Sequence, residues 1–354
     1  MINQIEFEKL CEYISKHHER ITSDKEVLRS IWHEAGKLNV FKNTSREESI
    51  IILDIMNKYG IYDFPFWLQR DVLLPLFERN ASDFQKNLYL EKIKKGELIC
   101  ALAITEETGG SSFDNITSKA ILDNDQFTIS SKKNVVTNAT IADLFFLVVK
   151  GNNNDLCLFL IDKAVHQIEI KNTITVSEVN GLSIGAVSCT ELVVGKEYKV
   201  GELGAIQLSI TYFLAIERFC CATLALGICR EIQSNIIKWL KARDKKRRYT
   251  SIWFELGDYY TSLQQCELLY NKVEREFIEK HNLFYSAAIL KYSVIKLLLN
   301  LSTSVARICG CYSIDMHSSI ETIKYRNLAY AYAAAGGTQE VMLKIINRYI
   351  QKHI

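Results

Sequence analysis

Residues 82–105 have the sequence SDFQKNLYLEKIKKGELICALAIT, and the spacing of the apolar side chains changes within this stretch. Ser82 and Asp83 can cap a helix over Phe84 to Ile93, where the spacing is helical. After Gly96, the short apolar run Leu98–Thr105 is typical of a buried strand. The stretch therefore predicts a change from helix to strand near residue 98.

The pattern on either side of this stretch extends the prediction. From Glu6 to about Lys95 apolar residues recur at helical spacing, with breaks at Gly60 and Pro65. Further strands are predicted over Gln126–Ser130, Leu144–Val149, Leu156–Ile161 and Val187–Val194. Long helices are then predicted over Ala205–Arg243, Ser251–Lys280, Tyr285–Cys311, Ser319–Ala335 and Gln339–His353. The predicted fold class is mainly α with a central β-domain: a helical domain at 1–97, a small antiparallel sheet or barrel at 98–203, and a helical bundle at 204–354.

Composition excludes several classes of protein. The 354 residues include 43 Lys and Arg against 41 Asp and Glu, and this balance does not suit a dedicated nucleic-acid binder. The ten cysteines form no CxxC pair and the seven histidines are scattered, so we expect reduced thiols, a cytoplasmic location and no metal site. The longest apolar run, Phe213–Cys229, carries Glu217 and Arg218, so no membrane span is expected.

A series of motifs follows in order along the chain. They are Asn80–Leu98, Thr105-Glu106 with Gly110-Ser111, Ser131–Asn138 with Ala142-Asp143, Glu217-Arg218, Ile308–Gly310, Tyr325–Asn327 and Gly336–Glu340. Together they resemble the acyl-CoA dehydrogenase family from about Asn80 to the C-terminus. The resemblance implies three domains, with FAD between the sheet and a C-terminal four-helix bundle. It also implies removal of a proton and a hydride from the α and β carbons of an acyl thioester.

The resemblance assigns FAD binding to a set of residues in these motifs: Ile104, Thr105, Gly110, Ser111, Val135, Thr137, Arg307, Gly310, Thr338 and Glu340. Thr105 and Thr137 each offer a hydroxyl and a backbone N–H to the flavin ring. The turn Gly109–Ser111 can bring backbone N–H groups close to a pyrophosphate. An ordinary hairpin turn and a plain strand residue are the alternatives for this turn and for Thr137.

Glu217 is the candidate base. Many members of the family place a glutamate where this chain has Gly336, or Ala335 if a one-residue length difference after Arg326 is placed later, and neither can accept a proton. A minority place the glutamate just before an arginine on the first bundle helix. The helical neighbours of Glu217, Phe213, Leu214, Cys220 and Cys221, are apolar, so its carboxylate should face the bundle interior or a cavity. The alternative is a structural glutamate paired with a distant lysine or arginine. Gly336 would still offer its N–H to the substrate carbonyl.

The chain departs from the family motifs at several positions. Val135 stands for a tryptophan, Glu107 for a proline, Ser112 for an aspartate and Arg307 for a glutamine that helps to bind FAD of a neighbouring subunit. A basic run replaces a loop that reaches the same cofactor, and its cations are Lys241, Arg243, Lys245, Lys246, Arg247 and Arg248. This run could be a solvated surface, hold the FAD pyrophosphate, or attract an acidic acyl-carrier protein.

Three functions follow from these observations. The leading one is an FAD-dependent dehydrogenase of acyl thioesters of CoA or an acyl-carrier protein. By analogy within the family, the short N-terminal region and the divergent flavin motifs together imply carrier-protein substrates in secondary metabolism. The alternatives are a flavin monooxygenase on the same fold and a scaffold protein that has lost FAD. In the family the bundle helices pack between subunits, and small residues that permit close backbone approach occur here at Ala331, Ala333, Ala334, Ala335, Gly336 and Gly337. The resemblance therefore implies a homodimer or homotetramer.

Overall fold

The computed structural model of the chain describes residues 1–174, 176, 179–202, 205–243, 250–313 and 322–353. Its contacts divide the chain into two compact units. Unit 1 comprises Met1–Ile55, Asp63–Val176 and Asn180–Leu214. Unit 2 comprises Met56–Tyr62, Ser177–Val179 and Ala215–Ile354.

The N-terminal region is helical, as the sequence predicts. Its elements are α1 (Gln4–Lys16), α2 (His18–Ser23), α3 (Lys25–Lys37), α4 (Arg46–Tyr59), the π-helical turn η1 (Leu68–Leu73), α5 (Leu74–Asn80) and α6 (Asp83–Lys94). Ser82 caps α6: its hydroxyl accepts the Gln85 N–H at 3.2 Å, while Gln85 Oε1 accepts the Ser82 N–H at 3.0 Å. The predicted cap is confirmed.

One buried side chain spans the change from helix to strand. Gln69 Nε2 donates to the carbonyls of Ile93 and Leu98, each at 3.2 Å, and Gln69 Oε1 accepts the Cys100 N–H at 3.0 Å. The amide therefore satisfies backbone groups where α6 ends and where the first strand begins.

Within its described residues, the central region forms one eight-stranded sheet. The strands are β1 (Cys100–Ala103), β2 (Lys119–Asp123), β3 (Gln126–Thr137), β4 (Leu144–Lys150), β5 (Leu156–Asp162), β6 (Glu169–Ile174), β7 (Ile184–Gly195) and β8 (Lys199–Val200). Most pairs are antiparallel, in the order β6-β7-β3-β2-β4-β5-β8. The predicted antiparallel sheet is thus confirmed, with two parallel pairings within it: β1 runs parallel to β4, and β2 also pairs with β4 in parallel. The sequence misses β2 and β6, which are largely polar or exposed.

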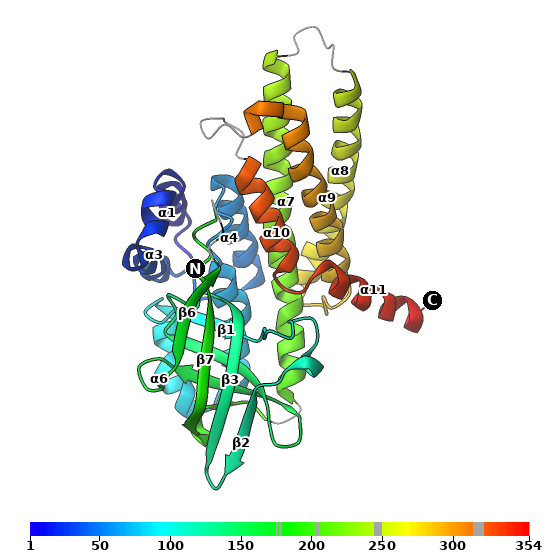
Figure 1. Cartoon of the computed structure of the whole chain (residues 1–354). Coiled ribbons are helices and arrows are strands. Elements are labelled where there is room, and N and C mark those ends of the chain that lie inside the picture. Colours follow the sequence, from blue (N-terminus) through cyan, green and yellow to red (C-terminus); the bar gives the residue numbers. More distant parts are fainter. Residues whose placement is uncertain (175, 177–178, 203–204, 244–249, 314–321, 354) are drawn as a thin grey trace. The chain divides into compact units, whose positions relative to one another are not determined.

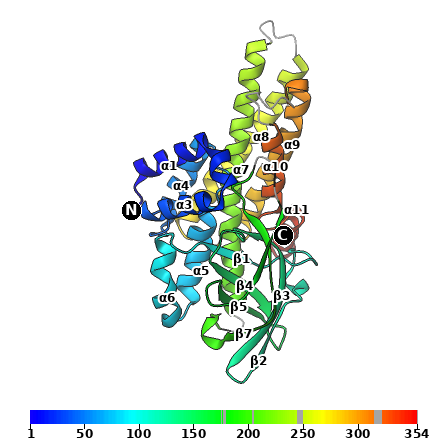
Figure 2. The same ribbon diagram turned by 60° about the vertical axis from the view of Figure 1, so that its left-hand side comes forward.

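The C-terminal region is helical, and its helices lie within a few residues of the predicted ranges. They are α7 (Ala205–Arg243), α8 (Thr250–Ile278), α9 (Ser286–Cys309), α10 (Thr322–Ala334) and α11 (Gln339–His353). The part of α7 after Leu214, together with α8, α9 and α10, forms a bundle in unit 2 (Figures 1 and 2). The start predicted at Ser319 lies outside the described residues. These elements confirm the predicted mainly α fold with a central β-domain.

Two bundle helices are long and apolar enough to cross a membrane by length and composition alone. They are α7 and the segment Ser286–Ser313, which contains α9. The sequence expectation of no membrane span rested on Glu217 and Arg218 within the apolar run of α7, and length and composition alone do not decide it. Within the apolar window of α7, 83% of the residues are buried, so packing against protein accounts for its apolar character.

Candidate active site

Glu217 lies on α7 within unit 2, among apolar neighbours. Phe213, Cys220 and Cys221 are buried, whereas Glu217 itself keeps part of its surface accessible. Burial raises the pKa of Glu217, while the charges of Lys291 and Arg218 and a backbone hydrogen bond from Gly336 oppose this rise. The two cations act through charge, and the hydrogen bond comes from the backbone. This arrangement suits a carboxylate that takes up a proton better than one locked in a direct ion pair.

Gly336 and Gly337 form the turn between α10 and α11, and both have positive φ angles, +64° and +102°. A Cβ on Gly336 would lie 3.5 Å from Glu217 Cγ and 3.6 Å from Arg218 Cγ, so the turn packs directly on these two side chains. The structure thus brings the two predicted catalytic residues together. It places the Gly336 N–H against the Glu217 carboxylate.

Arg218 joins this turn to α7 by a hydrogen bond. Its Nε donates to the Gly336 carbonyl at 3.1 Å, and its guanidinium lies 5.7 Å from the centre of the Phe284 ring. The residue is only 5% exposed, and among the described residues its Nη1 has no hydrogen-bond partner. Arg218 directly follows Glu217, so its side chain points about 100° away from that of Glu217 around the helix. Its charge nevertheless lowers the pKa of Glu217, because charges act over distance.

Lys291 on α9 completes the cluster, and sequence reasoning missed it. It is fully buried and its ammonium donates to the Gly337 carbonyl. Burial lowers the pKa of Lys291 to about 8, although the nearby Cys221 and Glu217 oppose this effect. The signal was available: its helical neighbours Ala287, Ala288, Val294 and Ile295 are all apolar, as around Glu217.

A second buried carboxylate organises the predicted flavin residues of unit 1. Lys133 Nζ lies 2.6 Å from Glu106 Oε1 and also donates to the Ile104 carbonyl at 3.2 Å. The Thr117 N–H at 2.7 Å, the Thr117 hydroxyl and the Ser118 N–H at 3.1 Å fill the remaining positions around Glu106. Burial disfavours the ionised carboxylate, but these donors outweigh it and lower the pKa of Glu106 to about 2. The pair fixes the backbone on both sides of Thr105.

Thr105, Gly110 and Val135 come together around this pair. Thr105 bridges to Val135, and the Thr105 carbonyl accepts the Asn134 N–H at 2.8 Å. A Cβ on Gly110 would lie 2.6 Å from Thr105 Oγ1, so any larger residue there would have to displace the Thr105 side chain. The Val135 side chain is 41% exposed and offers an apolar surface beside the threonine.

These residues fit a flavin. The hydroxyls of Thr105, Ser111 and Thr137 form no hydrogen bond to another residue in the described part of the chain, and none of the three side chains is buried. Thr137 ends β3, where it pairs with Ile184. The polar edge of a flavin ring requires accessible hydrogen-bond donors, which the two threonines offer. A pyrophosphate requires close approach of the backbone, which the glycine beside Thr105 permits.

The remaining predicted FAD residues lie elsewhere in unit 2. Thr338 caps α11: its carbonyl accepts the Met342 N–H at 3.0 Å, and its hydroxyl lowers the pKa of Glu340 by hydrogen bonding. Gly310 ends α9 with a φ of +58°. Arg307 forms an ion pair with Glu255 and lies about 24 Å along α9 from Lys291, at 1.5 Å per residue. The structure therefore does not bring Arg307 into the Glu217 cluster of the same chain.

The predicted basic run begins at the end of α7. Lys241 and Arg243 are exposed, and the Arg243 guanidinium lies 4.5 Å from the centre of the Trp239 ring and 4.4 Å from that of Tyr312. Arg243 therefore already makes two cation–π contacts. Lys245, Lys246, Arg247 and Arg248 lie outside the described residues.

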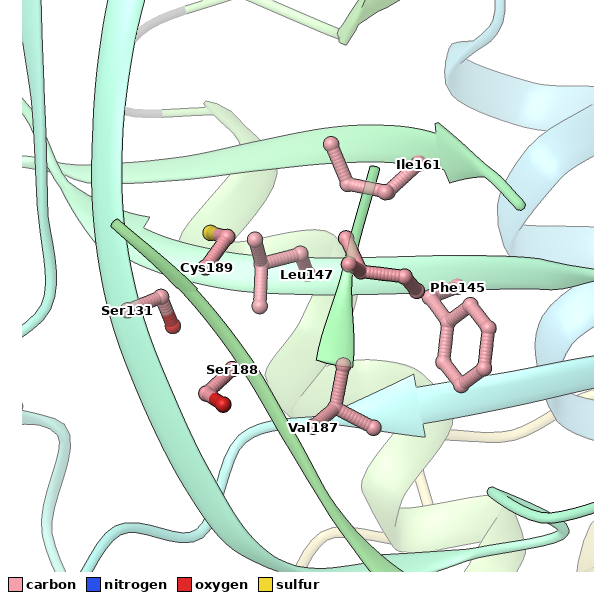
Figure 3. A pocket seen from close by; sticks show the side chains of 8 residues that line it. Ser131, Phe145, Leu147, Ile161, Val187, Ser188 and Cys189 are labelled. Atoms are coloured by element: carbon pink, nitrogen blue, oxygen red, sulfur yellow. The ribbon is translucent and has the colours of Figure 1, made fainter. Parts of the chain in front are cut away.

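Figure 3 shows a pocket within the β-domain. It lies beside the Glu106–Lys133 pair, because Ser131, which lines the pocket, accepts a hydrogen bond at 2.9 Å from Ser118, whose N–H binds Glu106. Its empty volume of about 210 Å³, open solvent included, is below the roughly 300–1,000 Å³ of typical ligand pockets. The lining is mostly apolar and carries no charged side chain: Ser131, Phe145, Leu147, Ile161, Ile168, Val187, Ser188 and Cys189. Such a pocket offers no group for acid–base chemistry.

Comparison with known proteins identifies related sequences. Residues 101–192 match the acyl-CoA dehydrogenase middle domain, and residues 208–351 match the acyl-CoA dehydrogenase C-terminal domain. The chain is similar to the mitochondrial isovaleryl-CoA dehydrogenase of Bos taurus, with 23% identity over 96% of this chain and 84% of the relative. It is also similar to the L-prolyl-[peptidyl-carrier protein] dehydrogenase of Serratia sp., with 24% identity over 56% of this chain and 53% of that relative. The chain thus spans about half the length of the latter protein.

Solved structures share the fold. An acyl-CoA dehydrogenase from Geobacillus kaustophilus superposes with a TM-score of 0.89 at 19% identity, covering 98% of this chain and 96% of the other. The FAD complex of PigA superposes with a TM-score of 0.86 at 17% identity, covering 99% and 98%. At these identities the likeness establishes the fold alone.

Proposed function

The chain belongs to the acyl-CoA dehydrogenase family, oxidoreductases that act on CH–CH bonds, and from this premise we propose that it dehydrogenates an acyl thioester with Glu217 as the base. In this reaction the α-carbon proton passes to the Glu217 carboxylate, and the C–H bond electrons form the new double bond as hydride leaves the β carbon. When bound, FAD supplies the acceptor for that hydride.

The observation that carries the proposal is the meeting of Glu217 with the Gly336 N–H. A base for an α proton and a donor for the neighbouring carbonyl must lie side by side, because the two substrate atoms are bonded neighbours. Both groups belong to unit 2, where the Gly336 N–H lies near enough to the Glu217 carboxylate to lower its pKa. A thioester carbonyl would take the place of the carboxylate as acceptor of this N–H.

The charge state of Glu217 also suits the role. Burial raises its pKa, which strengthens it as a base, and the charges of Lys291 and Arg218 limit the rise. A carboxylate whose pKa moves toward the working pH transfers protons more effectively than an ordinary surface glutamate. Turnover should therefore increase with pH as Glu217 loses its proton.

The flavin residues proposed for unit 1 are Thr105 and Thr137 at the ring and Gly110 with Ser111 at the pyrophosphate. Their accessible hydroxyls and the close approach of Gly110 to Thr105 support this assignment. The Glu106–Lys133 pair would hold Thr105 in place, since it fixes the neighbouring Ile104 carbonyl.

The substrate is proposed to be a thioester of CoA or of an acyl-carrier protein. The similar proteins include an isovaleryl-CoA dehydrogenase and a prolyl-carrier-protein dehydrogenase, so both carriers should be tested. A panel of matched acyl groups, each offered on CoA and on a phosphopantetheinylated carrier protein, separates the two possibilities by kcat/KM.

The mechanism is tested by Glu217→Gln in protein reconstituted with FAD. We expect turnover to fall by about 10²–10⁴-fold with FAD content unchanged, as for a lost general base. Glu231→Gln is the matched control: Glu231 lies on the same helix and accepts hydrogen bonds from Tyr62 at 2.6 Å and Tyr325 at 2.8 Å. It should retain turnover.

Other outcomes would overturn the proposal. Unchanged turnover in Glu217→Gln would remove this residue as the base. Failure to take up FAD at saturating concentration would favour the scaffold alternative. Oxygen-dependent hydroxylation of a substrate, without thioester dehydrogenation, would favour the monooxygenase alternative.

A further inference from the structure

Lys291 is a buried cation on α9, and the side chains on the same face of the helix are apolar. The residue has no exposed surface, and its helical neighbours at three and four positions are buried. Burying an ammonium is costly unless the protein compensates it with hydrogen bonds and opposite charge. The contacts of Lys291 show where that compensation comes from.

The first compensation is the Gly336–Gly337 turn. Lys291 donates to the Gly337 carbonyl, and Arg218 Nε donates to the preceding carbonyl, that of Gly336, at 3.1 Å. Two cations from different helices, α9 and α7, therefore hold two successive carbonyls of one turn. Glycine has no Cβ to restrict its backbone, and both glycines here have positive φ. The contacts from Lys291 and Arg218 therefore set the orientation of the turn.

The second compensation is the Glu217 carboxylate. Among the described residues, the titratable groups that act on Lys291 are Glu217, Arg218 and Cys221, all on α7. Glu217 is the acid among them, and Cys221 is a buried thiol whose pKa burial raises. The positive charge of Lys291 thus favours the ionised form of Glu217, whereas the burial of Glu217 disfavours that form.

We propose that Lys291 is a positioning residue for the dehydrogenation: its ammonium holds the Gly336–Gly337 turn against Glu217 and keeps Glu217 ionised for proton removal. The inference rests on the proposed function, because it assigns Lys291 a task only if Glu217 is the base. It adds a residue from a third segment, α9, to the turn and to α7.

The test compares Lys291→Met, Lys291→Arg and the control Lys296→Met in FAD-reconstituted protein. Lys296 lies on the same helix but is exposed. In Lys291→Met, the acidic limb of the kcat–pH profile should move to higher pH, so that kcat falls by about tenfold or more at acidic pH and by less at alkaline pH. Lys291→Arg keeps the charge and should restore the limb toward its wild-type position, and Lys296→Met should not move it.

A second measurement does not depend on turnover. The carboxyl stretch of protonated Glu217, assigned by its absence from Glu217→Gln, is followed by infrared spectroscopy against pH in flavin-free protein. The protonated band should persist to higher pH in Lys291→Met than in wild type. Melting temperatures identify any variant that fails to fold. If Lys291→Met does not fold, the infrared titration of Lys291→Arg is compared with that of the wild type instead.

Two results would overturn the inference. One is a uniform loss of kcat in Lys291→Met at every pH with an unchanged infrared titration, which would make Lys291 purely structural. The other is an equal shift of the limb in Lys296→Met. If Glu217→Gln keeps full turnover, the proposed function fails. If Glu217→Gln loses turnover but the kcat–pH profile of Lys291→Met does not shift, only the role of Lys291 is rejected.

Discussion

Glu106 in the β-domain and Glu217 in the bundle are both carboxylates whose ionised form burial disfavours, and each has a lysine nearby. Glu106 receives hydrogen bonds from Lys133, Thr117 and Ser118, and its pKa falls to about 2 despite burial. Glu217 receives one from a backbone N–H, and burial raises its pKa. The two sites combine the same residue types with opposite results.

The difference lies in how many donors reach each carboxylate. A carboxylate has about four acceptor positions, and each one filled by a donor stabilises the charged form. The Glu106 site is saturated and therefore behaves as a structural ion pair. The Glu217 site leaves acceptor positions open beside a turn, which is what a base that must take up a proton requires.

The largest expected effect on stability comes from breaking the saturated site. Glu106→Gln keeps the shape but removes the charge, so Lys133 remains buried without its counterion. The free energy of unfolding should fall by about 3–5 kcal/mol, measured by urea denaturation at neutral pH.

The double variant Glu106→Gln/Lys133→Met should recover part of this loss, because neither partner is then left buried alone. Glu217→Gln should cause no comparable loss. An equal loss in Glu217→Gln would mean that the two sites are the same kind of ion pair.

The contributions of the two carboxylates to the free energy of unfolding should change in opposite directions with pH. The pKa of Glu106 is about 2 in the folded chain, below its ordinary value of 4.5, so its stabilisation is present above 4.5 and lost as the pH falls toward 2. The loss amounts to about 3 kcal/mol at 1.36 kcal/mol per unit. Urea midpoints of wild type and Glu106→Gln, measured between pH 2 and 6, should therefore converge at the acid end.

Glu217 has the reverse sign. Its folded pKa is raised, so the ionised form is disfavoured by folding, and the unfolding free energy should fall as the pH rises above 4.5 until the raised pKa is passed. Relative to wild type, Glu217→Gln should gain stability over this interval. A relative gain for Glu217→Gln toward acidic pH instead would contradict the comparison.

A smaller effect is expected from the turn that borders Glu217. Gly336→Ala must adopt a φ of +64°, which costs an L-residue about 1–2 kcal/mol, although the new Cβ would make only an ordinary contact 3.5 Å from Glu217. The melting temperature should drop accordingly. Gly257→Ala in α8, where no atom lies within 4 Å of the new Cβ, should instead leave stability equal or higher.

Much of the fold was predictable because its signals are local. Helical spacing predicts α7, α8, α9 and α11 to within a few residues, and the Ser82 cap follows from a motif of four residues. The strands β2 and β6 were missed since most of their side chains are polar or exposed, and pairing with β3 and β7 decides their conformation.

The parallel pairing of β1 with β4 was missed for a related reason. The two strands are separated in sequence by β2 and β3, and no local pattern specifies which edge β1 will join.

For the candidate site, the sequence by itself determined which residues could carry the chemistry. The apolar neighbours of Glu217 on its own helix and the exclusion of Gly336 as a base are local facts. Only the tertiary structure decided what surrounds that carboxylate: Lys291 arrives from α9 and the Gly336 N–H from the turn after α10. The physical reason is that burial, charge and hydrogen bonding, which set a pKa, depend on distances in space, and distances between separate helices are fixed by packing.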